Sequence, residues 1–113
     1  IALRRMLTAM ERGDSLTEPA QLQGIRLGPV TLLGAPFEIF QAIKNDVVTQ
    51  AKSAIPLVLS VTNDSRGYAS DRVEAQRGGY ASDVVPMIHG CFPYANIHEE
   101  LVAHLVELEA ALG

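Results

Sequence analysis

The sequence is poor in the residues that build disulfide frameworks, cysteine-rich metal sites and membrane spans. It has one cysteine, Cys91, no tryptophan, and an aromatic share of only 5%. A single cysteine excludes an internal disulfide and cannot by itself form a cysteine-rich zinc site. No apolar run reaches the 18 residues that a membrane-spanning helix needs, so we expect no transmembrane segment.

Basic residues and several catalytic motifs are also scarce. Nine Lys and Arg face 13 Asp and Glu, a net charge of −4, and no basic run exists. We therefore expect no nucleic-acid partner, because binding to the phosphate backbone needs clustered positive charge. The sequence has no HExxH, GxSxG, GxGxxG or GK[ST] motif. These absences argue against a zinc-protease helix, a serine-hydrolase elbow and a phosphate-binding loop.

What the sequence does contain is enough for one globular domain. Its 113 residues are 48% hydrophobic and 19% charged, which excludes wholesale disorder and permits a single core. The first residues, IALRRMLTAMERG, have the pattern of a helix rather than of a signal peptide. We interpret residues 1–113 as a single domain or as the C-terminal segment of a larger domain that begins upstream. A natural mature N-terminus at Ile1 is the alternative.

Hydrophobic periodicity predicts alternating helices and strands. Helices are expected over residues 3–10, 37–51 and 97–112, and a short one over 72–77 capped by Asp71. Strands are expected over 22–27 and 30–33, joined at Gly28-Pro29, over 55–61 as a buried strand, and over 84–88. Residues 13–20 are expected to form a loop, and Asn96 to cap the last helix. Its core stripe is expected to comprise Ile97, Leu101, His104 or Leu105, Leu108 and Leu112.

This order of elements predicts a layered sheet-and-helix domain of the α/β or α+β class. The strands are too few to close a barrel. The pentapeptide GYASD occurs twice, at 67–71 and 79–83, and two such copies do not make a repeat protein.

The three histidines form no metal motif. His98 and His104 are six residues apart on the last predicted helix and so cannot share a metal from one face. We expect His98 to be a solvated surface residue and His104 to lie at the boundary of the core. His89 is expected in a loop, where pairing with Cys91 is a formal possibility.

Polar residues follow the predicted strand over 55–61. From residue types alone, Asn63 and Asp64 are expected to form a turn. Tyr68 is expected to be half-buried with a hydrogen-bonded hydroxyl group. Polar side chains that converge at the end of a strand can also carry function, which is the alternative.

Residues 22–113 resemble the end of the N-terminal catalytic domain of neutral/alkaline (non-lysosomal) ceramidases. The segment LQGIRLGPVTLLGAPFEIF (22–40) is similar to the family's block of two strands, a PGE(x)F motif and a helix. The segment LVLSVTNDSRGYASDRVEAQRGGY (57–80) is similar to its GLxNxYxxYxxTxEEYxxQxYE block, and retains Asn63, Tyr68, Glu74, Gln76 and Tyr80. The closing amphipathic helix is the third point of likeness.

The resemblance implies a zinc-dependent amide hydrolase that converts ceramide to sphingosine and a fatty acid. Such a site holds one zinc through two His, one Glu and one Tyr, with a water at the open position. Zinc chemistry suits this reaction, because the metal polarises a carbonyl and lowers the pKa of its water. The implied substrate is a lipid amide or another small amide.

Carried over residue by residue, the resemblance places the Tyr ligand at Tyr68 and identifies Asn63 and Tyr68 as catalytic candidates. The Glu ligand falls on Ala35, which cannot bind zinc, so that Glu38 replaces it or the ligand is lost. The family's earlier Tyr is Ser65 here, and its two His ligands would precede Ile1.

Three hypotheses follow. In the first, the chain is part of a zinc amide hydrolase, inactive alone, with zinc bound by Tyr68, Glu38 and the remainder of a parent chain. In the second, it is a catalytically degenerate ceramidase-like domain with a binding or structural role. In the third, it is an unrelated α/β domain whose loop sequence is similar by chance.

Overall fold

The computed structural model describes residues 1–16 and 19–113. It is an α+β structure in which helices cover one face of a small mixed sheet, so the predicted class of layered domain is confirmed. Part of the predicted loop, at positions 17 and 18, lies outside the described residues. None of the described helices has the length and apolarity required to cross a membrane.

The main sheet has three strands in the order β1-β2-β4. Strands β1 (Gln23–Leu27) and β2 (Val30–Gly34) form the predicted antiparallel hairpin, in which Leu27 pairs with Val30. Gly28 makes the turn with a φ of +61°, a conformation that is accessible to glycine without steric cost. Strand β4 (Ile55–Leu59) runs parallel to β2. The connection between these parallel strands passes through helix α2.

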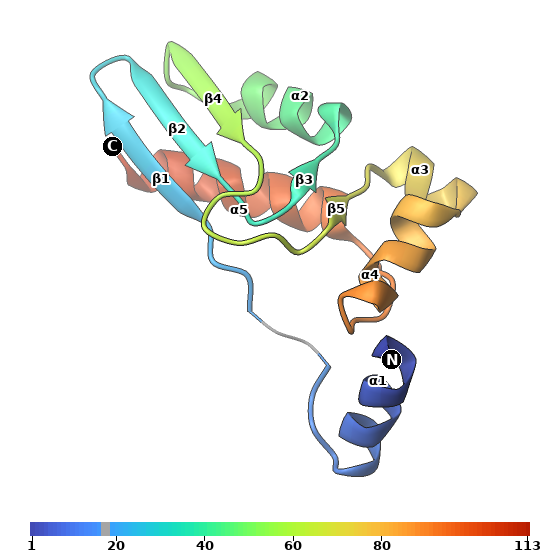
Figure 1. Cartoon of the computed structure of the whole chain (residues 1–113). Helices are drawn as coiled ribbons and strands as arrows, with labels where there is room; N and C mark the ends of the chain where they lie inside the picture. Colours follow the sequence, from blue (N-terminus) through green and yellow to red (C-terminus); the bar gives the residue numbers. More distant parts are fainter. Residues whose placement is uncertain (17–18) are drawn as a thin grey trace.

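Two helices pack against one face of this sheet. Helices α2 (Gln41–Gln50) and α5 (Ile97–Ala111) lie side by side behind the strands (Figure 1). The core between helices and sheet is mainly apolar, and Thr31 of β2 is a polar residue buried in it. Its fully buried large side chains include Leu33, Ile43, Val47 and Leu105.

The structure also contains a second sheet, which has two strands. Strand β3 (Glu38–Ile39) pairs in parallel with β5 (Tyr68–Ala69). The backbone N–H of Val61 donates to the carbonyl oxygen of Phe37, so the end of β4 also adjoins β3.

The remaining elements lie at the end of the molecule farthest from the hairpin (Figure 1). They are α1 (Ala2–Glu11), α3 (Arg72–Arg77), the π-helical turn η1 (Tyr80–Val84) and α4 (Val85–Ile88). The Asp71 side chain accepts a hydrogen bond from the Glu74 N–H, which confirms the predicted cap of α3.

Two predicted elements are wrong. The helix expected from Phe37 begins only at Gln41, because residues 38–39 are extended and pair with β5. The strand expected over 84–88 is helical, and Pro86 in the first turn of α4 explains why. Proline suits the first turn of a helix and cannot donate a hydrogen bond to a sheet.

The structure differs from three further expectations, and the first difference arises because the described helices cover only one face of the sheet. Strand β4 was expected to be buried, but Ile55, Leu57 and Leu59 are exposed. On α5 the core position belongs to Leu105, and His104 is exposed. Asn96 precedes α5 as predicted, but its side chain makes no capping hydrogen bond.

Candidate functional site

The parallel pairing of β3 with β5 places Glu38 directly opposite Tyr68. The Glu38 N–H donates to the Gly67 carbonyl oxygen at 2.9 Å, and the Phe40 N–H donates to Ala69 at 3.1 Å. Residues opposite one another in a sheet present their side chains on the same face. The structure therefore brings together two residues that are 30 positions apart in the chain and that the resemblance assigns to one zinc site.

This shared face points away from the core. Between Val30 and Phe40 the odd-numbered residues Ala35, Phe37 and Ile39 pack in the core, so Glu38 and Phe40 face outward. The Tyr68 ring packs edge-on against Phe40, with ring centroids 5.8 Å apart. Tyr68 is half-buried, as expected from its residue type, whereas Glu38 is exposed. Among the described residues, no partner accepts a hydrogen bond from the Tyr68 hydroxyl.

The turn before Tyr68 depends on Gly67. Its φ is +85°, and a Cβ at this position would lie 2.6 Å from Val85 Cγ1 and 3.1 Å from His89 Cδ2. The imidazole of His89 therefore packs against the backbone immediately before Tyr68. A larger residue at position 67 would push the 85–89 segment away and disturb the pairing of β5 with β3.

Asn63, the second catalytic candidate, lies elsewhere. It adopts a φ of +62°, the left-handed conformation that asparagine tolerates better than most residues, as expected for a turn former. It lines a small hollow of about 210 Å³ together with Pro36, Thr62, Asp64 and Arg66. Neither Glu38 nor Tyr68 lines this hollow, so a catalytic role for Asn63 stays a prediction.

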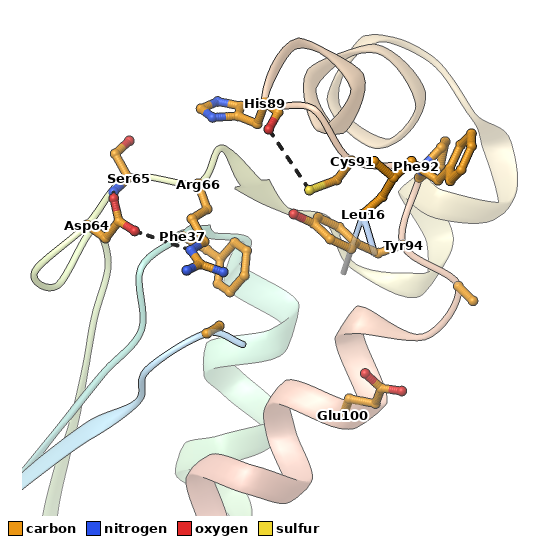
Figure 2. Close-up of a pocket in the computed structure, with 13 residues that line it drawn as sticks. Leu16, Phe37, Asp64, Ser65, Arg66, His89, Cys91, Phe92, Tyr94 and Glu100 are labelled. Atoms are coloured by element: carbon orange, nitrogen blue, oxygen red, sulfur yellow. Dashed lines mark hydrogen bonds and ion pairs between the residues drawn. The ribbon is translucent and has the colours of Figure 1, made fainter. Parts of the chain in front are cut away.

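A cavity of about 550 Å³ lies between the 64–66 turn and the 89–95 segment (Figure 2). Asp64 accepts hydrogen bonds from the Ser65 N–H and from Arg66 Nε, and these bonds lower the pKa of its carboxyl group. On the opposite wall, burial raises the pKa of Tyr94, and the neighbouring Cys91 raises it further. This cavity could not be predicted from the sequence, because its walls are two irregular segments that come together only in the folded chain.

The possible Cys91–His89 pair does not form through the imidazole. Cys91 Sγ approaches the backbone carbonyl oxygen of His89 at 4.0 Å, and Figure 2 shows the ring directed away from the thiol. This geometry gives Cys91 no general base.

His98 was expected at the surface, but only 3% of it is exposed. Its Nδ1 accepts a hydrogen bond from the Arg72 N–H at 3.0 Å, and its Nε2 lies 2.7 Å from an Asp46 carboxylate oxygen. Because Nδ1 accepts, Nε2 carries the proton and donates it to Asp46. Both ring nitrogens are thus occupied, and His98 has a structural role.

The residues present would supply a zinc ion with two oxygen ligands. Glu38 and Tyr68 offer a carboxylate and a phenol on one face, whereas Ala35 is fully buried and has no donor atom. Within residues 1–16 and 19–113, no three His, Cys, Asp or Glu side chains form a cluster able to hold a metal. A four-ligand zinc site therefore fits this chain only if other polypeptide supplies further ligands.

Comparisons of the sequence with protein-family models and with curated proteins, and of the fold with solved structures, find no match.

Proposed function

We propose that this chain forms part of a zinc-dependent amide hydrolase that resembles the neutral/alkaline ceramidases. The observation that carries this proposal is the register of β3 and β5, which pairs Glu38 with Tyr68 across the two strands. The resemblance places a ligand at Tyr68, and the fold supplies an acidic partner beside it although Ala35 cannot serve. The substrate class is a lipid amide or another small amide.

Each residue then has a defined task. Glu38 and Tyr68 would hold the zinc through oxygen atoms, and the remaining ligands would come from the rest of a parent chain. When bound, zinc polarises the amide carbonyl and lowers the pKa of a water ligand toward about 7. Phe40 packs against the Tyr68 ring and restricts its orientation, which fixes the direction of the phenol oxygen. Since two ligands do not make a catalytic site, the 113-residue chain alone is inactive.

A second function is favoured by Ala35. This residue occupies the position of the family's Glu and is fully buried among apolar side chains. If Glu38 does not replace the lost ligand, the chain is a degenerate relative that retains the fold for binding or assembly.

The two functions are separated by zinc content and amide hydrolysis in the full-length protein that contains this segment. We expect about one zinc per chain by elemental analysis, and release of fatty acid from a long-chain N-acyl amide. Glu38→Gln and Tyr68→Phe should each lower zinc retention and turnover by tenfold or more, since each removes a ligand.

Matched controls are available on the same chain. Glu107→Gln changes an exposed carboxylate on α5, and Tyr80→Phe changes an exposed phenol in η1. Both should leave zinc content and turnover unchanged. A zinc-free, well-folded protein without amidase activity would support the degenerate relative. Zinc retained in full by Glu38→Gln would remove Glu38 from the site, and hydrolysis by the 113-residue chain alone would contradict shared ligands.

A further inference from the structure

The face of the main sheet opposite the helices is apolar, and no helix or strand of the described residues covers it. Ile25 of β1 pairs with Leu32 of β2, which pairs in turn with Leu57 of β4. In the same way Leu27 pairs with Val30, and Val30 with Ile55, so all of these side chains share one face. We call this surface the open face; it consists of Ile25, Leu27, Val30, Leu32, Ile55, Leu57 and Leu59. None of these residues carries a charge. Five of the seven are between 42% and 62% exposed.

On the opposite side of the same strands, residues pack against the helices, so the two faces of the sheet differ in burial. A Cβ on Gly24 would meet Leu108 and Leu112 of α5, and Thr31 and Leu33 are buried beneath the helices. A sheet with two apolar sides is the pattern of a layer that is covered on both sides. The exposed apolar area of the open face is on the order of 400 Å², which is at the level of a functional patch.

Helix α1 provides a complementary surface. Leu3, Leu7 and Met10 lie along one stripe and are each at least 50% exposed, whereas Met6 is buried. Contacts join α1 to α4, and Figure 1 shows it set apart from the sheet. The radius of gyration is 15.3 Å, compared with about 13 Å for a compact chain of this length. We call residues 1–12 the arm.

Length and charge both favour a match between the arm and the open face. The ten residues of α1 extend about 15 Å, close to the roughly 17 Å of a five-residue strand. The arm contains three arginines and one acidic residue, whereas the rest of the chain has six basic and twelve acidic residues. The arm is therefore attracted to the body of another copy of the chain.

We propose that two copies of this chain associate by exchanging arms, so that α1 of each copy packs its Leu3, Leu7 and Met10 stripe on the open face of the other. This inference is independent of the zinc site. The open face and the arm stripe together expose roughly 700 Å² per copy, near the ~800 Å² that each partner buries in a standard interface. Reciprocal contacts of this kind give a closed two-fold dimer.

The first test is the mass of the 113-residue chain by light scattering and sedimentation between about 1 and 100 μM. We expect a dimer of twice 12.2 kDa. Leu57→Lys on the open face and Leu7→Lys on the arm should each weaken the dimer by tenfold or more, because each buries a charge. Val73→Lys is the control, since Val73 is 69% exposed on α3 and outside both surfaces. Circular dichroism checks that each variant is folded.

The second test separates arm exchange from other arrangements. In a Cys91→Ala background, Leu7→Cys and Leu57→Cys chains are mixed and oxidised. A disulfide between the two different chains is expected. Cross-links formed only between Leu57→Cys chains would indicate contact between two open faces and would overturn arm exchange. A monomer at all concentrations, or a dimer that Leu7→Lys leaves intact, would overturn it as well.

Discussion

Nε2 of His98 donates a hydrogen bond to the carboxylate of Asp46 across 2.7 Å and so joins α5 to α2. Nδ1 of the same ring accepts from the Arg72 N–H at the start of α3. One buried imidazole therefore connects three helices. Arg72 extends the connection through its side chain, which makes an ion pair with Glu99 at 2.7 Å.

Removing this imidazole should destabilise the fold. His98→Ala leaves the Arg72 N–H and the Asp46 carboxylate without their partner and opens a cavity, so we expect a loss of about 2–3 kcal/mol in the free energy of unfolding. Urea denaturation measures it. His104→Ala on the same helix is the matched control and should change stability by less than about 0.5 kcal/mol, because His104 is exposed. Equal effects of the two substitutions would contradict the structural role of His98.

The two helix caps should differ in energy. Asp71→Ala removes the hydrogen bond from the Glu74 N–H, at 2.9 Å, and should cost about 1 kcal/mol. Asn96→Ala removes a side chain that makes no capping bond, so its cost should be below about 0.5 kcal/mol. Thermal and urea denaturation of both variants provide the comparison. A larger loss for Asn96→Ala than for Asp71→Ala would show that α5 is capped in solution.

Glu109 should make the free energy of unfolding depend on pH. It is 6% exposed and accepts a hydrogen bond from the Ser53 N–H at 2.8 Å. Burial raises the pKa of this carboxyl group, but hydrogen bonds from Ser53 and Lys52, together with the charge of Arg26, lower it by more, so that it lies below its ordinary value of 4.5. A lowered pKa means that the carboxylate stabilises the fold above about pH 4.5, and that this contribution is lost as the pH falls through the folded-state pKa.

Glu109→Gln tests this dependence. At pH 7 we expect it to cost about 1 kcal/mol, since the charge-assisted hydrogen bond is lost. The difference from the wild type should shrink in urea denaturation at successively lower pH. Glu107→Gln is the control on the same helix, and should leave the loss of stability at low pH the same as in the wild type. A difference that is constant from pH 7 to pH 3 would contradict the role of Glu109.

Gly34 should resist substitution because of a close neighbour. A Cβ on Gly34 would lie 2.5 Å from Thr62 Oγ1 and 2.8 Å from Thr62 Cβ. Gly34→Ala should therefore cost about 1–3 kcal/mol through overpacking. The double variant Gly34→Ala/Thr62→Gly should recover part of that loss, which a double-mutant cycle measures. Additive effects would show that the two residues do not interact.

The sequence was sufficient where local signals agree. The hairpin at Gly28-Pro29, the cap at Asp71 and the amphipathic α5 each depend on residues close together in the chain, and the structure contains all three. Local sequence patterns did not predict the elements that are held by strand pairing between distant parts of the chain. Residues 38–39 have the period of a helix, but hydrogen bonds to residues 67–69 hold them as a strand.

Burial was hardest to predict from the sequence. His98 appeared to be solvated, because nothing in its own helix reveals that Asp46 and the start of α3 cover it. The exposure of Ile55, Leu57 and Leu59 was missed for the opposite reason, since an apolar run does not show that one of its sides lacks a covering layer. For the candidate site, the resemblance assigned Glu38 and Tyr68 to one zinc site, and the pairing of β3 with β5 that places them opposite one another could not be predicted from local patterns.

That register also has a consequence for synthesis on the ribosome. Both parallel pairings, β2 with β4 and β3 with β5, can form only after helix α2, which lies between the paired strands in the chain, has been synthesised. An emerging chain can form the hairpin early, but it cannot place Tyr68 beside Glu38 until residue 69 has left the exit tunnel. Contacts between such distant positions slow the search for the native state. Until then the apolar side chains of the hairpin are exposed on both of its faces.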